Sequence, residues 1–225
     1  MTSTTYVAFR ASDRLHQLTD GFVHRMRDGA REPEPRTVER IMTTFIDEAL
    51  TAFFLTPASY SGLGSTQRRL VGLAADTISK ASGVVIGRSA RKMDLAQNQA
   101  AAEYMDGIRF PGPRHAFWYV GFPIDEALAS RGHGLAERCQ AGHFEGTRDD
   151  LMHYLRAITD RSLEWYFNKP IDLLGFGPIL RKVAAVGVQT TRKASYGVIG
   201  KVIPNLTDEQ VLQSALYYRD LQVRH

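Results

Sequence analysis

Hydrophobic residues recur at helical spacing along most of the chain. After Pro35 they return every three or four positions from Val38 to Phe53, which predicts one face of an amphipathic helix that Pro57 ends. N-capping residues, glycines and prolines mark the ends of similar runs. The predicted helices cover residues 12–27, 36–56, 65–92 and 94–107 in the first half of the chain, and 125–141, 147–168, 178–202 and 207–222 in the second.

Strand signals are weak by comparison. Short aromatic segments at residues 6–9 and 119–122 have the composition of strands, but they are too few for a sheet of any size. The pattern therefore predicts an all-α protein.

The second half of the chain repeats the first at a fixed offset of 113 residues. Tyr6 and Val7 fall on Tyr119 and Val120, and 25 pairs are identical in all, where average amino-acid usage gives about seven. Glycines and prolines keep the same offset, which argues against coincidence. We expect an internal tandem duplication: two four-helix repeats, residues 1–113 and 114–225, related by a pseudo-two-fold axis and packed as one globular unit.

The third helix of each repeat carries a stripe of small residues. The first stripe is Ala74, Thr77 and Ala81, and its counterpart begins at Gly187. Small side chains let helix backbones approach closely, so we expect these two helices to cross near the pseudo-two-fold axis. Several glycines within them each cost about 1 kcal/mol relative to alanine, which indicates a packing or bending role. Ordinary kinked core helices are the alternative.

Length, composition and charge narrow the class of protein. The 225 residues are 44% hydrophobic and 23% charged, which excludes a disordered chain. No uncharged apolar stretch approaches 18 residues and no signal peptide is evident, so we expect a cytoplasmic location. The single cysteine, Cys139, excludes an internal disulfide. The net charge of +4 is only mildly basic, and the sequence lacks the basic recognition helix of a specific nucleic-acid-binding protein.

Two acids lie on faces that the periodicity predicts to be apolar. Asp47 and Asp160 occupy equivalent positions, and Arg68 and Arg181 are arginines shared at equivalent positions beyond the first helix. We expect the pairs Asp47–Arg68 and Asp160–Arg181, with a structural role that joins the second helix to the third.

Each third helix begins after a Gly-x-Gly sequence with cations in its first turn. Arg68, Arg69, Arg181 and Lys182 could face an anion such as a phosphate or a lipid head group, although simple turn glycines explain the pattern as well. The segment 173–182 resembles a surface-seeking cationic stretch, but its counterpart 60–69 is more polar. This comparison disfavours peripheral membrane contact.

Acids and histidines of one repeat or the other offer an enzymatic alternative. They faintly resemble the acid-and-histidine pairs of helical di-iron sites, but the repeat does not place them equivalently, so we expect no metal and no cofactor. A nucleophile elbow is missing, and the two Lys-Ala-Ser sequences place their lysine and serine on different helix faces. The residues concerned are Asp13, His16, Asp20, His24, Asp150 and His153.

Large aromatic residues appear where the two repeats diverge. Four such residues have small or polar counterparts in the first repeat: His115, Phe117, Trp118 and Trp165. We expect them to line a site between the halves, although asymmetric filling of the core explains them too. The function that we predict is non-enzymatic binding of an anionic amphiphile or a protein partner in that groove, together with the four cations named above. A metal-dependent or cofactor-free helical enzyme is the alternative, and the sequence leaves the ligand and the oligomeric state open.

Overall fold

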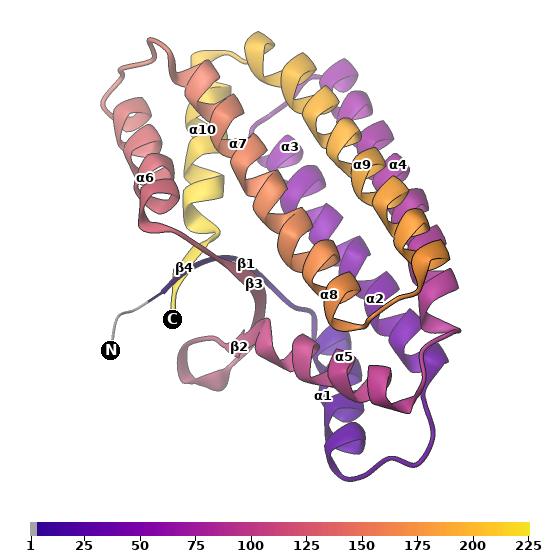
Figure 1. Ribbon diagram of the computed structural model, residues 1–225. Coiled ribbons are helices and arrows are strands. Elements are labelled where there is room, and N and C mark those ends of the chain that lie inside the picture. Colours follow the sequence, from indigo (N-terminus) through magenta and orange to yellow (C-terminus); the bar gives the residue numbers. More distant parts are fainter. Residues whose placement is uncertain (1–3) are drawn as a thin grey trace.

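A computed structural model describes residues 4–225 of the chain, which form a mostly helical molecule with one small sheet (Figure 1). The expectation of a mainly α-helical fold is confirmed. The expectation that no sheet of any size forms is wrong, because four short strands pair into one antiparallel sheet.

The first half of the chain begins and ends with a strand. Its elements are β1 (Thr5–Arg10), α1 (Asp13–Arg27), α2 (Pro35–Leu50), the π-helix η1 (Thr51–Leu55), α3 (Thr56–Tyr60), α4 (Ser65–Ala90), α5 (Leu95–Gly107) and β2 (Arg109–Pro111). A 3₁₀ turn, η2 (Pro113–His115), leads to the second half.

The second half presents its elements in a similar order. They are β3 (Trp118–Ile124), α6 (Glu126–Gln140), α7 (Thr147–Leu163), the π-helix η3 (Glu164–Asn168), α8 (Lys169–Leu173), α9 (Pro178–Val202), the 3₁₀ turn η4 (Ile203–Asn205), α10 (Asp208–Asp220) and β4 (Gln222–Arg224).

Capping side chains set where several helices begin. The Ser12 hydroxyl accepts a hydrogen bond from the Leu15 amide at 3.1 Å, and Asp125 does the same for Leu128 at 2.8 Å. The Thr207 hydroxyl accepts from the Gln210 amide at the start of α10. These bonds satisfy amide groups that have no partner within the helix, so the predicted starts agree closely with the structure.

The second helix of each half does not end where a proline was expected to end it. Pro57 and Pro170 lie within α3 and α8, immediately after the π-helices η1 and η3. A proline inside an α-helix loses a hydrogen bond and clashes with the preceding turn. The wider π-helical turn changes the hydrogen-bond register just before the proline, so the chain continues as a helix.

The sheet has the strand order β2-β3-β1-β4, with β1 and β3 paired at its centre. Ala8 lies opposite Gly121 in this central pair. A Cβ atom on Gly121 would lie only 2.6 Å from the Cβ of Ala8, so glycine is required there for the two strands to approach. The three-residue strands β2 and β4 cover the outer edges of β3 and β1.

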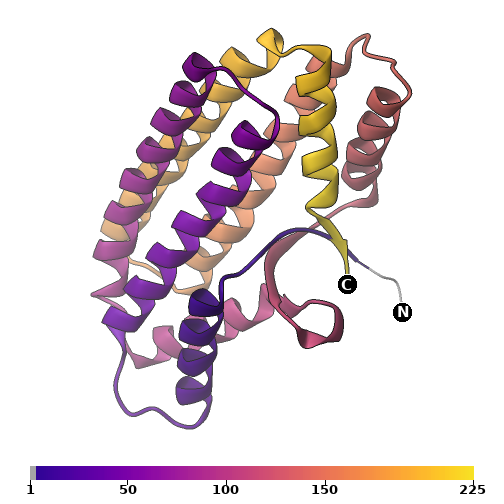
Figure 2. The same ribbon diagram turned by 180° about the vertical axis from the view of Figure 1, so that it is seen from behind.

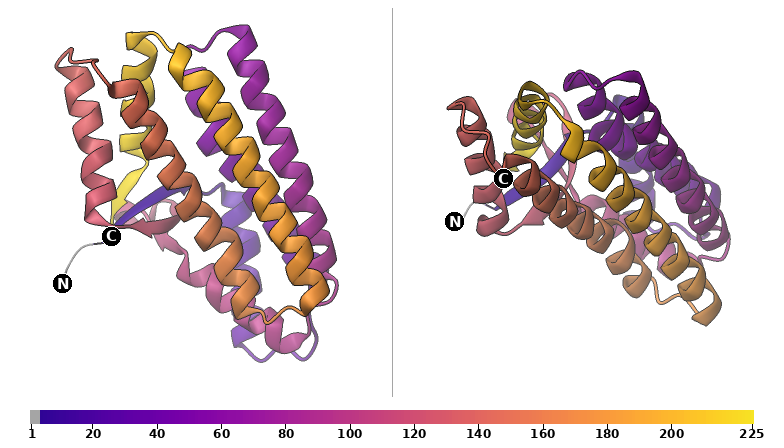
Figure 3. Two further views of the ribbon diagram at one scale, coloured as in Figure 1. Left: turned by 45° about the horizontal axis from the view of Figure 1, so that its top comes forward. Right: turned by 90° about the horizontal axis from the view of Figure 1, so that it is seen from above.

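Helices α4 and α9 lie side by side along one edge of the molecule, on the side away from α6 (Figures 1 and 3). They run antiparallel: Gln67, at the start of α4, donates to the carbonyl of Asn205, just beyond the end of α9. They pack closely at Gly187, where an added Cβ would lie 2.6 Å from Val85. The expected close packing is confirmed here, but Gly72, Gly83 and Gly197 have no described atom within 4 Å of an added Cβ, so packing does not require glycine at these positions.

Seen from behind, α2 runs beside α4 and closes the bundle on that side (Figure 2). By length and composition α4 could cross a bilayer, although Asp76 and Lys80 interrupt its apolar stretch. Only 33% of its most apolar window is buried inside the molecule.

Candidate functional site

Two apolar cavities lie inside the helical bundle, and residues from both halves of the chain line each of them. Cavity 1, of about 140 Å³, lies among α2, η1, α4, α7, η3 and α9. Cavity 2, of about 110 Å³, lies among α1, α2, α4, α5, η3 and α8. Pockets that bind small molecules are mostly apolar with a few placed polar groups, so these two cavities are candidate sites.

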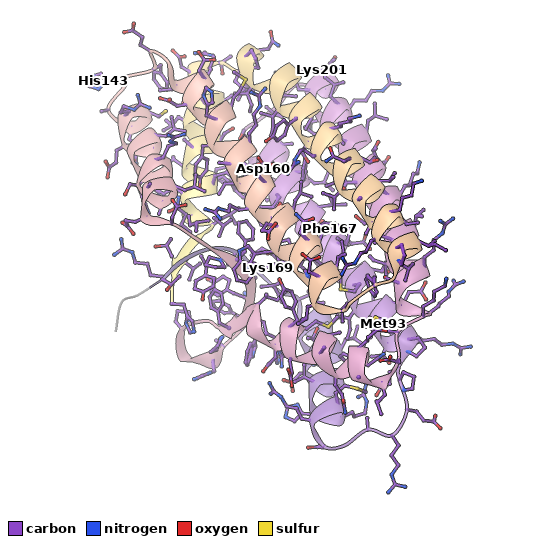
Figure 4. The ribbon with its side chains drawn as sticks, in the orientation of Figure 1. Met93, His143, Asp160, Phe167, Lys169 and Lys201 are labelled. Carbon is purple, nitrogen blue, oxygen red and sulfur yellow. The ribbon has the colours of Figure 1, made fainter. Side chains whose placement is uncertain are left out.

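The two cavities share a wall. Phe45 and Ile46 on α2, and Tyr166 and Phe167 on η3, line both of them. Figure 4 labels Phe167 in the lower part of the bundle, together with Met93, a cavity 2 residue, where α4 leads to α5. The Tyr166 ring packs edge-on against Phe45 at 4.8 Å between ring centroids. The π-helix therefore brings two successive aromatic side chains to the junction of the cavities.

Of the four residues that line both cavities, Tyr166 is the one with a polar side-chain group. The side chain is 93% buried, and its oxygen has no hydrogen-bond partner among residues 4–225. Burial, with a smaller contribution from nearby Tyr104, raises the pKa of Tyr166 far above its usual value, so the hydroxyl is neutral at pH 7. The Thr191 hydroxyl, in the wall of cavity 1, also lacks a partner within the described chain.

These unpartnered groups are costly. A buried donor without an acceptor destabilises a folded protein by about 1–3 kcal/mol. By contrast, the other polar side chains nearby are satisfied: the Tyr104 hydroxyl donates to the carbonyl of Trp165, and Ser61 pairs with Ser214 at 2.9 Å. The side chain shared by the two cavities thus carries a hydrogen-bond donor that no described residue satisfies.

A charged group lies at one end of cavity 2. The Arg109 side chain is only 5% exposed and donates to Asp20 at 2.9 Å and Asp106 at 2.8 Å. Its guanidinium lies 5.0 Å from the ring of Trp118, and the imidazole of His16 stacks on the same indole at 4.8 Å. Burial, together with the charge of Arg109, lowers the pKa of His16. Because two carboxylates already neutralise Arg109, this end of the cavity is polar but offers little free positive charge.

The residues predicted for a binding site do not converge. Arg68 and Arg69 are exposed in the first turn of α4, whereas Arg181 and Lys182 are exposed in the first turn of α9. Since the two helices run antiparallel, these cation pairs lie at opposite ends of the bundle. Arg181 also donates a hydrogen bond to the carbonyl of Phe176 at 2.8 Å, in the loop just before α9.

The predicted aromatic residues are also dispersed. Among the described lining residues, Trp118 borders cavity 2, while Trp165 borders neither cavity and packs against the ammonium of Lys169 at 3.3 Å. His115 is exposed at the tip of the hairpin between β2 and β3, with a φ of 55°. Phe117, in the same hairpin, lies beneath the guanidinium of Arg10.

The expected ion pairs are wrong in their partners. Asp160 (Figure 4) binds Arg192 at 2.9 Å and accepts from the Tyr196 hydroxyl, both on the next helix in space, rather than Arg181. Asp47 is exposed and has no ion pair with Arg68 or any other described residue. Position on an apolar helix face predicted that a partner exists for Asp160, but the antiparallel packing of α7 and α9 decides which one it is.

The acids and histidines of the enzymatic alternative are spread over several elements. Asp20 pairs with Arg109, Asp150 pairs with Arg138 on α6, and His153 contacts a carbonyl of its own helix at 2.8 Å. Within residues 4–225 no group of three or more potential metal ligands comes together.

Neither a family model, nor a curated protein, nor a solved structure matches this chain.

Proposed function

We propose that this protein binds a small, largely apolar molecule that carries one hydrogen-bond acceptor. The observation that carries the proposal is Tyr166, whose side chain lines both apolar cavities and whose buried hydroxyl has no partner in the described part of the chain. A ligand acceptor would satisfy this donor, and the apolar remainder of the ligand would fill the space on either side. We therefore favour a largely uncharged ligand over the anionic amphiphile expected from the sequence, because Arg109 is the single cation among the described cavity residues and is already paired.

The cavity dimensions favour a compact ligand. An engineered protein cavity of about 150 Å³ lined by aliphatic and aromatic side chains stays dry and binds benzene. Each of the present cavities, at about 140 and 110 Å³, is close to that size. A single ring with a short substituent suits one cavity, and a longer chain would need both.

We also propose that the two cavities are equivalent sites of a duplicated architecture, with residues 1–113 and 114–225 as its two copies. Four observations support this. η1 and η3 start 113 residues apart, as do α4 and α9. Ala8 pairs with Gly121, its counterpart at that offset. Pro57 in cavity 1 corresponds to Pro170 in cavity 2, and Val198 in cavity 1 to Val85 in cavity 2. Tyr104 and Tyr217 donate to the equivalent carbonyls of Trp165 and Ala52.

A matched ligand pair tests the binding proposal. Acetophenone and α-methylstyrene have almost the same shape, but only acetophenone carries an acceptor oxygen. We expect both to raise the unfolding temperature of the purified protein, and acetophenone to bind about fivefold more tightly, since one hydrogen bond contributes about 1 kcal/mol. In Tyr166→Phe this preference should disappear while α-methylstyrene still binds. If neither compound stabilises the protein, or if the preference survives in Tyr166→Phe, the proposal is wrong.

A further inference from the structure

The outward faces of α4 and α9 combine exposed apolar side chains with cations. Leu73 and Val84 on α4 are 54% and 51% exposed, and Ile179 and Val186 on α9 are 76% and 61% exposed. Side chains spaced by seven and eleven positions share one side of a helix, so each pair forms a stripe. Because α4 and α9 lie side by side, we treat their exposed stripes together and term them the α4–α9 face.

The same two helices hold most of the positive charge of the protein. Together they contain nine lysines and arginines and one acid, Asp76, which is a net charge of +8, while the whole chain is only +4. The remainder of the molecule is therefore net negative. Among the described residues, Arg192 is the one cation of the two helices that forms an ion pair. The other eight cations face solvent or backbone rather than carboxylates.

Charged and apolar residues alternate along the face. Lys80 lies on α4 between Leu73 and Val84, and Lys193 follows Val186 on α9 at the same spacing. Lys201 lies near the far end of α9 (Figure 4). Interfacial helices of membrane-bound proteins show this combination, with apolar side chains that enter the lipid boundary and cations that contact anionic head groups. At about 1.5 Å per residue, 25 residues of α9 give a face nearly 40 Å long.

We propose that the α4–α9 face binds the surface of a bilayer that contains anionic phospholipids, with both helices parallel to the membrane plane. Charge complementarity selects this partner over a second copy of the chain, because a self-associated face would bring two cationic surfaces together. The exposed leucine, valines and isoleucine select it over nucleic acid, whose phosphates need cations alone. The segments 60–69 and 173–182 do not contain this face, since it forms only when α4 packs beside α9.

Vesicle flotation tests this proposal and does not depend on the cavity ligand. The full-length protein should float with vesicles of phosphatidylcholine mixed with phosphatidylserine, and much less with phosphatidylcholine alone. Each cation near an anionic membrane contributes about 1 kcal/mol, or about fivefold, so Lys80→Gln with Lys193→Gln should weaken binding by about 25-fold. The matched control is Arg31→Gln with Arg131→Gln, which removes the same charge from exposed positions in a loop and on α6 and should retain most of the binding.

A second variant tests the apolar contribution. Leu73→Ser with Val186→Ser keeps every charge and replaces only exposed side chains, so it should fold normally and still lose vesicle binding by more than tenfold. Circular dichroism melting checks that each variant is folded. Equal flotation with both vesicle compositions would overturn the proposal, and so would full binding by either α4–α9 variant. A dimer in the absence of vesicles that Leu73→Ser with Val186→Ser dissociates would assign the face to a second copy instead.

Discussion

Removal of the Tyr166 hydroxyl should stabilise the ligand-free protein. The change Tyr166→Phe leaves the ring and its contact with Phe45 in place and deletes only the oxygen, which has no partner within residues 4–225. An unsatisfied buried polar group costs about 1–3 kcal/mol, so we expect the free energy of unfolding to rise by about 1–2 kcal/mol. For a chain of this length that corresponds to about 3–6 °C in unfolding temperature.

Tyr104→Phe is the matched control. It removes the same atom from the same residue type at a nearby position, but the Tyr104 hydroxyl donates to the carbonyl of Trp165. Loss of that bond should lower the free energy of unfolding by about 1 kcal/mol. Urea unfolding at pH 7, on protein freed of bound apolar molecules by a hydrophobic resin, measures both variants. At this pH both hydroxyls are neutral, since burial raises the pKa of each residue.

The opposite signs of the two effects make the comparison decisive. If Tyr166→Phe instead lowers the free energy of unfolding by 1 kcal/mol or more, the hydroxyl has a partner in the folded protein. The argument for a ligand acceptor at the cavity junction would then fail.

Further variants test other contacts. Gly187→Ala should destabilise the protein by more than 1 kcal/mol in urea unfolding, because its Cβ would lie 2.6 Å from Val85, whereas Gly83→Ala, with open space around it, should stabilise by about 0.5–1 kcal/mol. The pKa of His16 is lowered in the folded state, so its protonation opposes folding. The free energy of unfolding should therefore fall as the pH drops below about 6.5. Unfolding curves measured between pH 7 and 5 should show a smaller loss for His16→Phe. Arg109→Ala leaves two carboxylates without their shared partner and should cost about 3 kcal/mol in the same unfolding assay, and a cost below 1 kcal/mol would contradict the pairing.

Helix positions were predictable from the sequence because each is set by nearby residues. The capping residues Asp94 and Thr207 act on amides three positions away, and the three-to-four spacing of apolar residues is also local. The π-helix η1 was not predictable from the same signals. A proline such as Pro57 indicates a helix end by its missing amide, and only the surrounding packing allows the π-helical turn that lets the helix continue.

The sheet was missed for a related reason. Strands of three residues, such as 109–111 and 222–224, are too short to show alternation, and they form only because β1 and β3 present free edges to them. Strand propensity depends strongly on such neighbours.

The candidate site was predictable only in principle. Divergence between the two halves was expected to mark the site, and Tyr166 is such a residue, since its counterpart is Phe53 and the two differ by one hydroxyl. That difference is smaller than the replacement of a small or polar residue by tryptophan, so the prediction favoured Trp118 and Trp165. The burial of the Tyr166 oxygen and the position of η3 between two cavities depend on tertiary packing, which no local pattern reports.

The pairing of Ala8 with Gly121 has a consequence for how such a molecule can be assembled. Space at the crossing of β1 and β3 admits one methyl group and not two. Two separate, identical chains that met through this strand would have to carry glycine at both positions. When both strands belong to one polypeptide, β1 can carry an alanine, with its stiffer backbone, while β3 carries the glycine. Covalent continuity thus permits an asymmetry that a symmetric homodimer is denied.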